Sequence, residues 1–533
     1  MKTMPSDDDE ARKYVKEYLE AHRLDLDRMK HCQMANWYSP RDLSQAGTDF
    51  FLSALLKGRQ DYRMLEALAE EQPLFDYSAH QIDGTSGIWI DYVADLADGF
   101  NPTYAIATLL ARPQLTVGPH TTRRGDVLIM GGNEVYPSAT REDYQNRLVE
   151  PYEAASIPPP DMERPHLFAI PGNHDWYDGL ISFMRLFAQK RTLGLWQTRQ
   201  SRSYFALKLP HNWWLLGVDI QLDSDIDRPQ IDYFTTIARE QMKPGDRIIL
   251  CTAEPDWVLG KVYDPRMQHN LAFLEKELLK HQPAAQVIVR LAGDLHHYRH
   301  HVADGDRHNI ISGGGGAFLH PTHGLNVDTV RSGPEGDMSV YTLKSSFPSI
   351  ATSRRLAWRN LGFLRLNFDF GLITAIAYSL LSLTFITPTP GTLVGALVLL
   401  RLIVFFTDTH HRLYKIIGGT FHGLSHLTAA FAVTRLLCLW RGITFFNDAL
   451  PPSTAEQLLI MFLAGLAGWV IGPIIMGVYL LVSLNVFGRH GNEAFSSLRI
   501  QDYKNFLRMH SVSYTHLRAH ETKANLVCRL LLE

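Results

Sequence analysis

Cysteine is scarce in this 533-residue chain. The four cysteines, Cys32, Cys251, Cys438 and Cys528, stand far apart, and none belongs to a CxxC pair. This spacing indicates neither a disulfide framework nor a thiolate zinc site. We therefore expect reduced thiols in a protein that faces the cytosol.

The chain also lacks a large excess of charge and an export signal. The formal net charge is -3, with 46% hydrophobic and 20% charged residues, which excludes a disordered composition and a globally basic nucleic-acid-binding protein. No nucleic-acid partner is indicated. The opening sequence MKTMPSDDDEARKYVKEYLEAHR has no apolar stretch of signal-peptide length, so export of the N-terminal half is not expected.

Short apolar runs dominate the first 360 residues. They lie at 87–95, 126–132, 166–172, 213–219, 246–253, 285–293 and 308–316. Helix-like stretches separate most of them, at 102–112, 139–149, 177–190 and 268–281. Runs of this length bounded by Gly, Asp and Asn predict buried strands, and the alternation predicts an α/β domain whose polar residues gather at strand ends.

Long apolar stretches follow residue 360. They lie at 368–388, 391–408, 417–440 and 457–487, and each approaches the roughly 20 residues that a membrane-spanning helix requires. We expect four spans. The last stretch contains GWVIGPIIMG, so a kinked helix, or two short helices making five spans, is the alternative.

Basic residues flank these stretches unevenly. They gather before the first, after the second and after the fourth, at Arg354, Arg355, Arg359, Arg365, Arg412, Lys415, Arg489 and Arg499, whereas the connection TPTPG is uncharged. The positive-inside rule then places both ends of the region in the cytoplasm, although Arg435 and Arg441 favour the opposite orientation. We expect an integral protein of a bacterial inner (plasma) membrane with a cytoplasmic N-terminal domain.

Side chains that bind metals follow several predicted strands. They are Asp95, Asp98, Asn133, Tyr136, Asn173, His174, Asp175, Glu254, Asp294 and His296. Oxygen and nitrogen ligands without cysteine suit manganese, magnesium, iron or zinc. Residues so far apart in sequence can converge only if neighbouring strands end at one edge of a sheet.

The order of these motifs resembles that of the calcineurin-like metallophosphoesterase superfamily. The resemblance covers residues 88 to about 325, and GNHD at 172–175 is its most specific part. It implies a four-layer α/β/β/α sandwich, followed in this chain by an all-α transmembrane bundle. It also implies two divalent metal ions at the strand ends, which activate a water molecule and clamp a phosphoryl group.

The resemblance also assigns roles to single residues. Asp95 would bind the first metal ion, and Asn173 would bind the second through its amide oxygen. His296 would close the cluster. His174 would face the substrate as a general acid or phosphate-stabilising group, held in orientation by Asp175.

The chain departs from the family pattern at four motifs. Ala97 stands where His or Gly is expected, and Asn133 replaces the bridging carboxylate. The fourth-motif His is absent beside Glu254, and Asp294 occupies the first His position of the fifth motif. Either Asp98, Glu254 and Asp294 rebuild an oxygen-rich site, or the metal cluster is partly lost. The three carboxylates favour a retained site, with Asp95, Asp98, Asn133, Asn173, Glu254, Asp294 and His296 as its predicted ligands.

Other polar residues have weaker signals. Tyr136 follows Asn133 at the spacing of an iron-binding tyrosine in purple acid phosphatases, but a packed edge residue is the favoured interpretation. His320 and His323 belong to a glycine-rich loop, which is favoured as a tight turn over a phosphate contact.

His297 is expected beside the ligands, and His300 and His301 are expected in solvent. His422 and His426 lie one helical turn apart in the third apolar stretch, where helix-to-helix hydrogen bonding is favoured over a proton or metal function.

The resemblance and the composition together divide the chain. We expect an N-terminal helical extension at 1–84, a metallophosphoesterase-like catalytic domain at 85–355 and a transmembrane region of about four helices at 360–490. A cytoplasmic segment at 491–512 follows. The last stretch, 513–533, does not continue the preceding pattern and resembles a translated sequencing-adapter tail, so we interpret it as non-native.

Three functions fit this division. The first is a membrane-anchored, metal-dependent phosphoesterase that hydrolyses a phosphate ester or anhydride of a small molecule or lipid with a metal-activated water. The second is a catalytically impaired domain that binds a phosphorylated ligand and regulates its membrane region. The third, less favoured, is a transporter that uses His422 and His426. Neither the oligomeric state nor the metal identity follows from the sequence.

Overall fold

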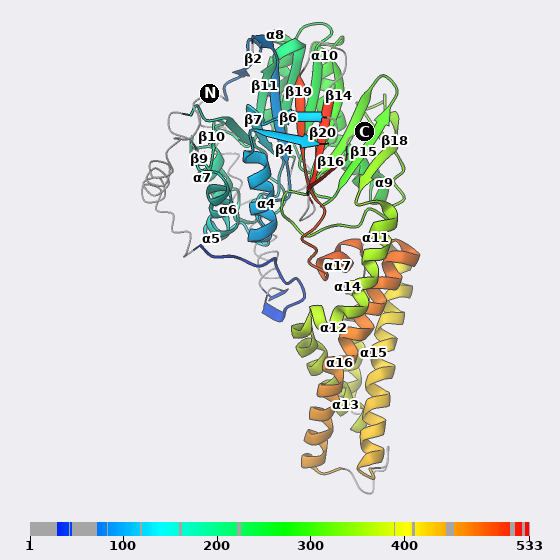
Figure 1. The fold of residues 1–533 in the computed structure, drawn as a ribbon. Coiled ribbons are helices and arrows are strands. Elements are labelled where there is room, and N and C mark those ends of the chain that lie inside the picture. Colours follow the sequence, from blue (N-terminus) through cyan, green and yellow to red (C-terminus); the bar gives the residue numbers. More distant parts are fainter. Residues whose placement is uncertain are drawn as a thin grey trace, which may run out of the picture.

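Two mixed sheets form the centre of the N-terminal domain (Figure 1). The structure, a computed structural model, describes residues 29–41, 43–44, 72–82, 84–117, 120–158, 162–220, 225–387, 390–407, 411–443, 452–511, 518–524 and 528–531. Most of the predicted extension at 1–84 lies outside these residues.

The first sheet has eight strands. Their spatial order is β21 (Cys528–Leu531), β20 (Arg518–Ala524), β19 (Lys504–Ser511), β4 (Ile88–Val93), β7 (Val127–Met130), β8 (His166–Ala169), β10 (Trp196–Thr198) and β9 (Thr192–Leu193). The run β4, β7 and β8 is parallel, so these three strands end at the same edge.

The second sheet has nine strands. Their order is β1 (Phe75–Asp76), β11 (Phe205–Leu209), β12 (Trp213–Gly217), β13 (Arg247–Cys251), β14 (Gln286–Ala292), β16 (Arg307–Ser312), β15 (Tyr298–Ala303), β18 (Ser339–Phe347) and β17 (Thr329–Ser332). The strands β12, β13, β14 and β16 are parallel. Two small hairpins, β2 (Gln81–Ile82) with β3 (Thr85–Ser86) and β5 (Gln114–Val117) with β6 (His120–Arg123), complete the strands.

Alternating apolar residues build a layered core. In β4, Ile90 and Tyr92 face the second sheet, whereas Val93 faces a helical layer. That layer comprises α4 (Phe100–Ala111), α5 (Arg141–Asp143), η1 (Tyr144–Val149), α6 (Glu150–Ala155), η2 (Asp175–Asp178) and α7 (Ile181–Phe187). On the outer face of the second sheet pack α8 (Arg228–Glu240) and α10 (His269–His281). In the chain, η3 (Pro210–Asn212) joins β11 to β12, and α9 (Asp256–Val262) and η4 (Pro265–Gln268) lie between β13 and α10. The prediction of a mixed α/β domain is confirmed.

The eight-stranded sheet is discontinuous in sequence. Its strand β19 comes after the whole C-terminal helical region and pairs antiparallel with β4, with Leu507 opposite Tyr92 and Met509 opposite Ile90. The sequence-based division treated 491–512 as a separate segment, whereas the structure places Lys504–Ser511 inside the sheet. The helical region is therefore an insertion between β18 and β19. The strands β20 and β21 lie within 513–533, and the interpretation of that stretch as non-native stays a prediction.

The helical region contains four long antiparallel helices: α13 (Gly371–Ile386), α14 (Pro390–Phe406), α15 (Arg412–Trp440) and α16 (Thr454–Phe487) (Figure 1). They are preceded by α11 (Ile350–Ala357), η5 (Trp358–Gly362), α12 (Phe363–Leu366) and η6 (Phe368–Phe370), and α17 (Gly491–Ser496) follows them. Three of the described helices, over Phe368–Ile386, Arg412–Trp440 and Thr454–Phe487, are long and apolar enough to cross a membrane. The remaining predicted span, the second at 391–408, corresponds to the shorter apolar helix Leu393–Phe405.

The last apolar stretch forms one helix. α16 runs for 34 residues with Pro473 inside it, so the two-helix alternative does not apply. Large apolar side chains point outward from the bundle, among them Leu397, Phe405 and Val486, which are 65%, 67% and 69% exposed. Such a surface is unusual in water and suits a lipid surrounding.

An apolar core joins the domain-side end of the bundle to the domain. Leu480 and Leu484 of α16 pack with Phe363, with Phe495 of α17 and with Leu319 of the glycine-rich loop. Because Leu319 adjoins the strand-end edge, this packing holds the bundle beside the candidate site.

Candidate functional site

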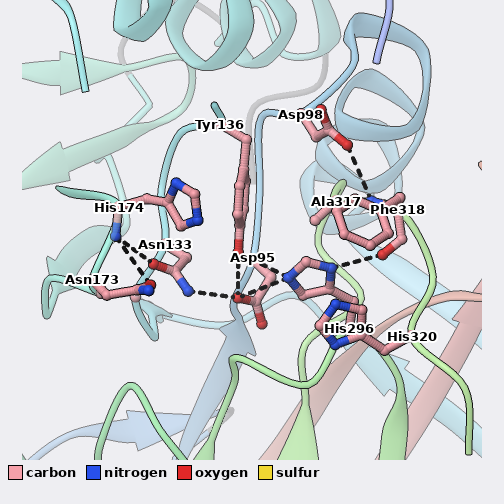
Figure 2. A network of polar contacts seen from close by, with 12 residues as sticks. Asp95, Asp98, Asn133, Tyr136, Asn173, His174, His296, Ala317, Phe318 and His320 are labelled. Atoms are coloured by element: carbon pink, nitrogen blue, oxygen red, sulfur yellow. Dashed lines mark hydrogen bonds and ion pairs between the residues drawn. The ribbon is translucent and has the colours of Figure 1, made fainter. Parts of the chain in front are cut away.

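The predicted ligands gather where strands of both sheets end (Figure 2). Asp95 follows β4 and Asn133 follows β7 in one sheet, while Asp294 follows β14 in the other. Together with Ala97, these residues have a left-handed backbone, with φ between 40° and 65°. This conformation is strained for residues with a Cβ, and its concentration at one edge is typical of a functional site.

Asp95, Tyr136 and His296 form the buried centre of the site. The Tyr136 hydroxyl donates to Asp95 Oδ1 at 2.9 Å and lies 2.9 Å from His296 Nε2. Asp95 Oδ1 and His296 Nε2 are 3.7 Å apart. None of the three residues is more than 4% exposed. The pair Asp95 and Tyr136 comes from one sheet and His296 from the other, so the centre spans the gap between the sheets.

These three donors suit a metal ion. His296 Nδ1 lies 2.7 Å from the Phe318 carbonyl oxygen, which fixes the proton on Nδ1 and leaves a lone pair on Nε2. The Tyr136 hydroxyl has one proton to share between two acceptors, Asp95 Oδ1 and His296 Nε2. Among the described residues, Asp95 Oδ2 has no hydrogen-bond partner. A cation at this point would satisfy lone pairs that the single proton cannot.

Burial disfavours charge at the centre. It raises the pKa of Asp95 well above its usual range, and the neighbouring Asp294 carboxylate adds to this shift. Burial, with a smaller effect of His320, lowers the pKa of His296. Both pKa shifts apply to the site without a bound cation. A bound cation would lower the pKa of Asp95 and so oppose its upward shift.

Asn133 cannot replace a bridging carboxylate in its observed orientation. The backbone N–H of His174 donates to Asn133 Oδ1 at 3.1 Å, so the amide nitrogen faces Asp95 and donates to its Oδ1 at 3.2 Å. The amide oxygen is thus engaged away from the centre. The geometry fits one ion at Asp95, Tyr136 and His296, and does not provide the bridge between two ions.

Asp98 points away from this centre (Figure 2). Its carboxylate accepts the backbone N–H of Ala35 at 2.8 Å and that of Phe318 at 3.2 Å. The predicted metal ligand therefore binds the N-terminal segment to the glycine-rich loop. Burial raises the pKa of Asp98, and the Ala35 N–H, the charges of Arg147 and Lys504 and the Phe318 N–H each oppose this shift.

His174 faces the cavity but is not held by Asp175. Its ring Nδ1 lies 3.0 Å from the Pro137 carbonyl oxygen, and its backbone N–H also donates to Asn173 Oδ1 at 3.1 Å. Asp175 instead accepts from the Gly172 N–H at 2.8 Å and the Tyr144 hydroxyl at 2.6 Å, so it stabilises the backbone turn that carries His174. The expected orienting role of Asp175 is wrong, because its oxygens are already engaged in this turn.

Glu254 and Asp294 form a second, looser acidic pair. Burial, followed by the charge of Asp294, raises the pKa of Glu254 to about 8, and burial raises that of Asp294 to about 6. Asp294 lines the site cavity. In the part of the chain that the structure describes, no three His, Cys, Asp or Glu side chains are close enough to hold one metal ion. The three-donor centre exists because a tyrosine, Tyr136, takes the third position.

A cavity of about 390 Å³ opens over the centre. Trp37 lies edge-on to the rings of His174 and Phe318, with centroids 6.1 and 6.3 Å away, and His320 stacks on His296 at 3.9 Å. No sequence signal marked Trp37, because its position depends on how the N-terminal segment crosses the domain.

The remaining histidines have mainly structural contacts. His300 and His301, expected in solvent, are 9% and 0% exposed, because β15 lies inside the nine-stranded sheet. His301 Nε2 lies 2.7 Å from the Val327 carbonyl oxygen. His297 is also fully buried. His323 contacts Ser353 Oγ at 2.8 Å and Asn485 Oδ1 of α16 at 3.0 Å, so it links the loop to the bundle.

Comparison with known proteins gives matches among solved structures alone. No family model matches the chain, and no curated protein matches it. GAP50, the anchor in the inner membrane complex of Plasmodium, matches 51% of this chain and 94% of its own, at 12% identity and a TM-score of 0.31. The purple acid phosphatase PPD1 from seeds of yellow lupin (Lupinus luteus) matches 49% of this chain and 48% of its own, at 12% identity and a TM-score of 0.30.

Proposed function

We propose that the protein is a membrane-anchored, metal-dependent phosphoesterase of the calcineurin-like type. The observation that carries this proposal is the convergence of Asp95, Tyr136 and His296, with a fixed histidine tautomer, at the common end of parallel strands. Asp95 and Tyr136 would hold the ion through oxygen and His296 through Nε2. A divalent cation there would supply Lewis-acid stabilisation of a phosphoryl group and a water molecule of lowered pKa.

His174 would act on the substrate from the same cavity. Burial lowers its pKa to about 4, so its imidazole is neutral near pH 7. With Nδ1 held by Pro137, Nε2 is then a proton acceptor. The negative charge of a bound phosphate would raise its pKa and favour the imidazolium, which donates a hydrogen bond to phosphate or a proton to the leaving group.

The helical insertion would place this site at a membrane surface. Three helices have the length and composition of membrane spans. Arg412 begins α15 and Arg489 follows the end of α16, both on the side of the domain, and Arg354 and Arg355 belong to α11, which precedes the first span. The positive-inside rule then favours a cytoplasmic domain at a bacterial inner membrane. A reporter fused after residue 511 should be cytoplasmic, and an external reporter would overturn this orientation.

The enzyme proposal is tested with the full-length protein in detergent. We expect bound metal in elemental analysis, and hydrolysis of p-nitrophenyl phosphate or bis(p-nitrophenyl) phosphate with Mn²⁺. His296→Asn should reduce both metal content and turnover, whereas His300→Asn, a change outside the centre, should reduce neither. The absence of both metal and turnover in the natural protein, with manganese, iron, zinc and magnesium each supplied, would overturn the proposal.

His174→Ala tests the substrate-facing role separately. Turnover should fall by roughly 10²-fold while bound metal stays unchanged, because a positioned acid or base contributes about this factor. An unchanged rate would remove His174 from the mechanism.

A catalytically impaired, ligand-binding domain is the second candidate. The observation that favours it is the amide of Asn133, which donates to Asp95 where the family has a bridging carboxylate. Asn133→Asp should then create or greatly increase phosphatase activity in a protein that otherwise lacks it. If the natural chain is active and Asn133→Asp has no effect, this second function is excluded.

A further inference from the structure

A second cavity lies between the domain and the bundle. It measures about 360 Å³ and has α9 on one side, at Val258, Leu259 and Val262, and the end of α16 on the other, at Leu484. Four residues, Asp294, His320, Asn492 and Glu493, line both this junction cavity and the site cavity. The two cavities therefore adjoin.

An apolar groove lies on the outside of the bundle, near its domain-side end. It measures about 440 Å³ and runs between α15 and α16, where Ile417, Phe421, Val482 and Phe487 line it. Phe421 and Phe487 are 69% and 57% exposed. The groove belongs to helices of membrane-spanning length, so its natural surrounding in a bilayer is lipid.

His490 lies between the junction cavity and the groove. It lines the cavity, and its Nε2 lies 3.0 Å from the hydroxyl of Tyr479, which lines the groove. Gly488, with φ of 65°, ends α16 and turns the chain so that Arg489 and His490 reach the cavity.

The lining changes character along this route. The groove is almost wholly apolar, whereas the lining of the junction cavity combines apolar residues of α9 with the basic residues Arg489 and His490. Two carboxylates, Asp294 and Glu493, also line this cavity, and the carboxylate of Glu493 lies 3.4 Å from His490 Nδ1. An apolar tail followed by a phosphate head group fits this order, because guanidinium groups bind phosphate strongly.

We propose that the substrate is a membrane phospholipid. Its acyl chains occupy the groove between α15 and α16, and its phosphate passes Arg489 to reach the site at Asp95, Tyr136 and His296. This inference rests on the proposed phosphoesterase function and adds the substrate class to it. Water adds to phosphorus and the phosphoester bond breaks, with one proton delivered to the leaving oxygen.

The experiment compares lipid and soluble substrates that share a head group. The full-length protein in mixed micelles is given dioleoyl phosphatidic acid or dioleoyl phosphatidylglycerol, and in parallel glycerol 3-phosphate or glycerophosphoglycerol, with Mn²⁺. We expect kcat/KM to be at least about 10-fold higher for one lipid than for its soluble counterpart, because apolar burial contributes to binding.

Two variants locate the lipid path. Ile417→Trp, which fills the groove, should lower kcat/KM for the lipid by about 10-fold through KM and leave the soluble substrate unchanged. Leu397→Trp, at an exposed bundle position outside the groove lining, is the matched control and should change neither rate. Arg489→Gln should raise KM for the lipid with little change in kcat.

The outcomes separate the two proposals. Turnover of soluble phosphoesters without lipid preference, or equal effects of Ile417→Trp on both substrate types, would overturn the lipid inference and leave the phosphoesterase intact. An absence of turnover on every substrate would overturn the phosphoesterase proposal, and the lipid substrate with it.

Discussion

The two sheets face one another across one core, but the chain assembles them differently. The main strands of the nine-stranded sheet follow one another within Phe205–Phe347. The eight-stranded sheet takes β4, β7 and β8 from the first 170 residues and then receives β19 after an insertion of four long helices. The site needs both sheets, since Asp95 and Tyr136 follow one and His296 the other. Asp95, Tyr136 and His296 all precede the bundle, so the return of the chain completes the eight-stranded sheet that carries Asp95, and adds none of these three side chains.

The largest predicted effect comes from removing β19. Ending the chain after Tyr503 deletes Phe506, Leu507 and Met509, each no more than 1% exposed. Large core side chains contribute about 2–5 kcal/mol each, so this loss approaches the whole stability of a typical domain. We expect insoluble or unfolded protein, measured by solubility and by tryptophan fluorescence.

Ending the chain after Ser511 is the matched control. It keeps β19, and we expect a folded protein with unchanged metal binding. A folded, active chain that ends at Tyr503 would show that the eight-stranded sheet does not need its late strand.

A buried ion pair in each sheet allows a second comparison. In the eight-stranded sheet Arg508 Nε lies 3.1 Å from Asp91 Oδ1, and on the nine-stranded sheet Arg290 Nη2 of β14 lies 2.5 Å from Glu275 Oε2 of the covering helix α10. Removing one partner of such a pair costs about 3–5 kcal/mol, because the other charge stays buried. Arg508→Met and Arg290→Met should both lower Tm in thermal unfolding by several degrees.

A double change tests the Arg508–Asp91 pair further. Arg508→Met with Asp91→Asn should restore part of the lost Tm, since no uncompensated charge remains, although Asp91 also accepts the Gly125 N–H at 3.0 Å. A double variant less stable than the sum of the two single changes would contradict this account of Asp91 and Arg508.

Removing the Tyr136 hydroxyl, which lies between the sheets, should have a smaller effect. Tyr136→Phe removes the oxygen that lies 2.9 Å from both Asp95 and His296 while keeping the buried ring. We expect metal affinity to fall by about 10–100-fold, measured by competition with a chelator of known affinity. Tyr144→Phe, which removes the hydroxyl bound to Asp175, is the control and should leave the affinity within a few-fold. Equal losses in both variants would mean that Tyr136 does not bind the ion.

The smallest effect concerns pH. Burial lowers the pKa of Lys504, at the start of β19, from 10.5 to about 8. Between these two values the unfolded chain binds the proton and the folded chain does not, so the free energy of unfolding rises with pH. The rise should be about 1 kcal/mol for the first pH unit above 8 and should disappear in Lys504→Met. Parallel pH profiles for the two proteins in chemical denaturation would contradict this pKa.

Local patterns in the sequence predicted much of the molecule. Apolar runs near 88–93, 127–130 and 166–169 became β4, β7 and β8, because a buried strand is recognisable from its own residues. Asp95 and Asn133 follow neighbouring parallel strands and therefore share an edge, whereas His296 follows β14 of the other sheet and joins them because the two sheets face one another. The apolar stretches after residue 360 likewise became long helices.

Other features depended on contacts between distant segments. Asp98 follows the same strand as Asp95 but binds the Ala35 N–H, and nothing near Asp98 in sequence indicates that partner. Asn133 is a plausible ligand by type, yet the His174 N–H turns its oxygen away.

By itself, the sequence determined the strands, the long apolar helices and the set of polar residues at the strand ends, since each depends on neighbours within a few positions. The tertiary structure alone decided which polar residues form the centre, that Tyr136 is one of them, and that β19 returns to close the sheet. The physical reason is that strand pairing and side-chain orientation depend on hydrogen-bond partners far away in the chain. The local periodicity of apolar residues does not indicate which distant residues those partners are.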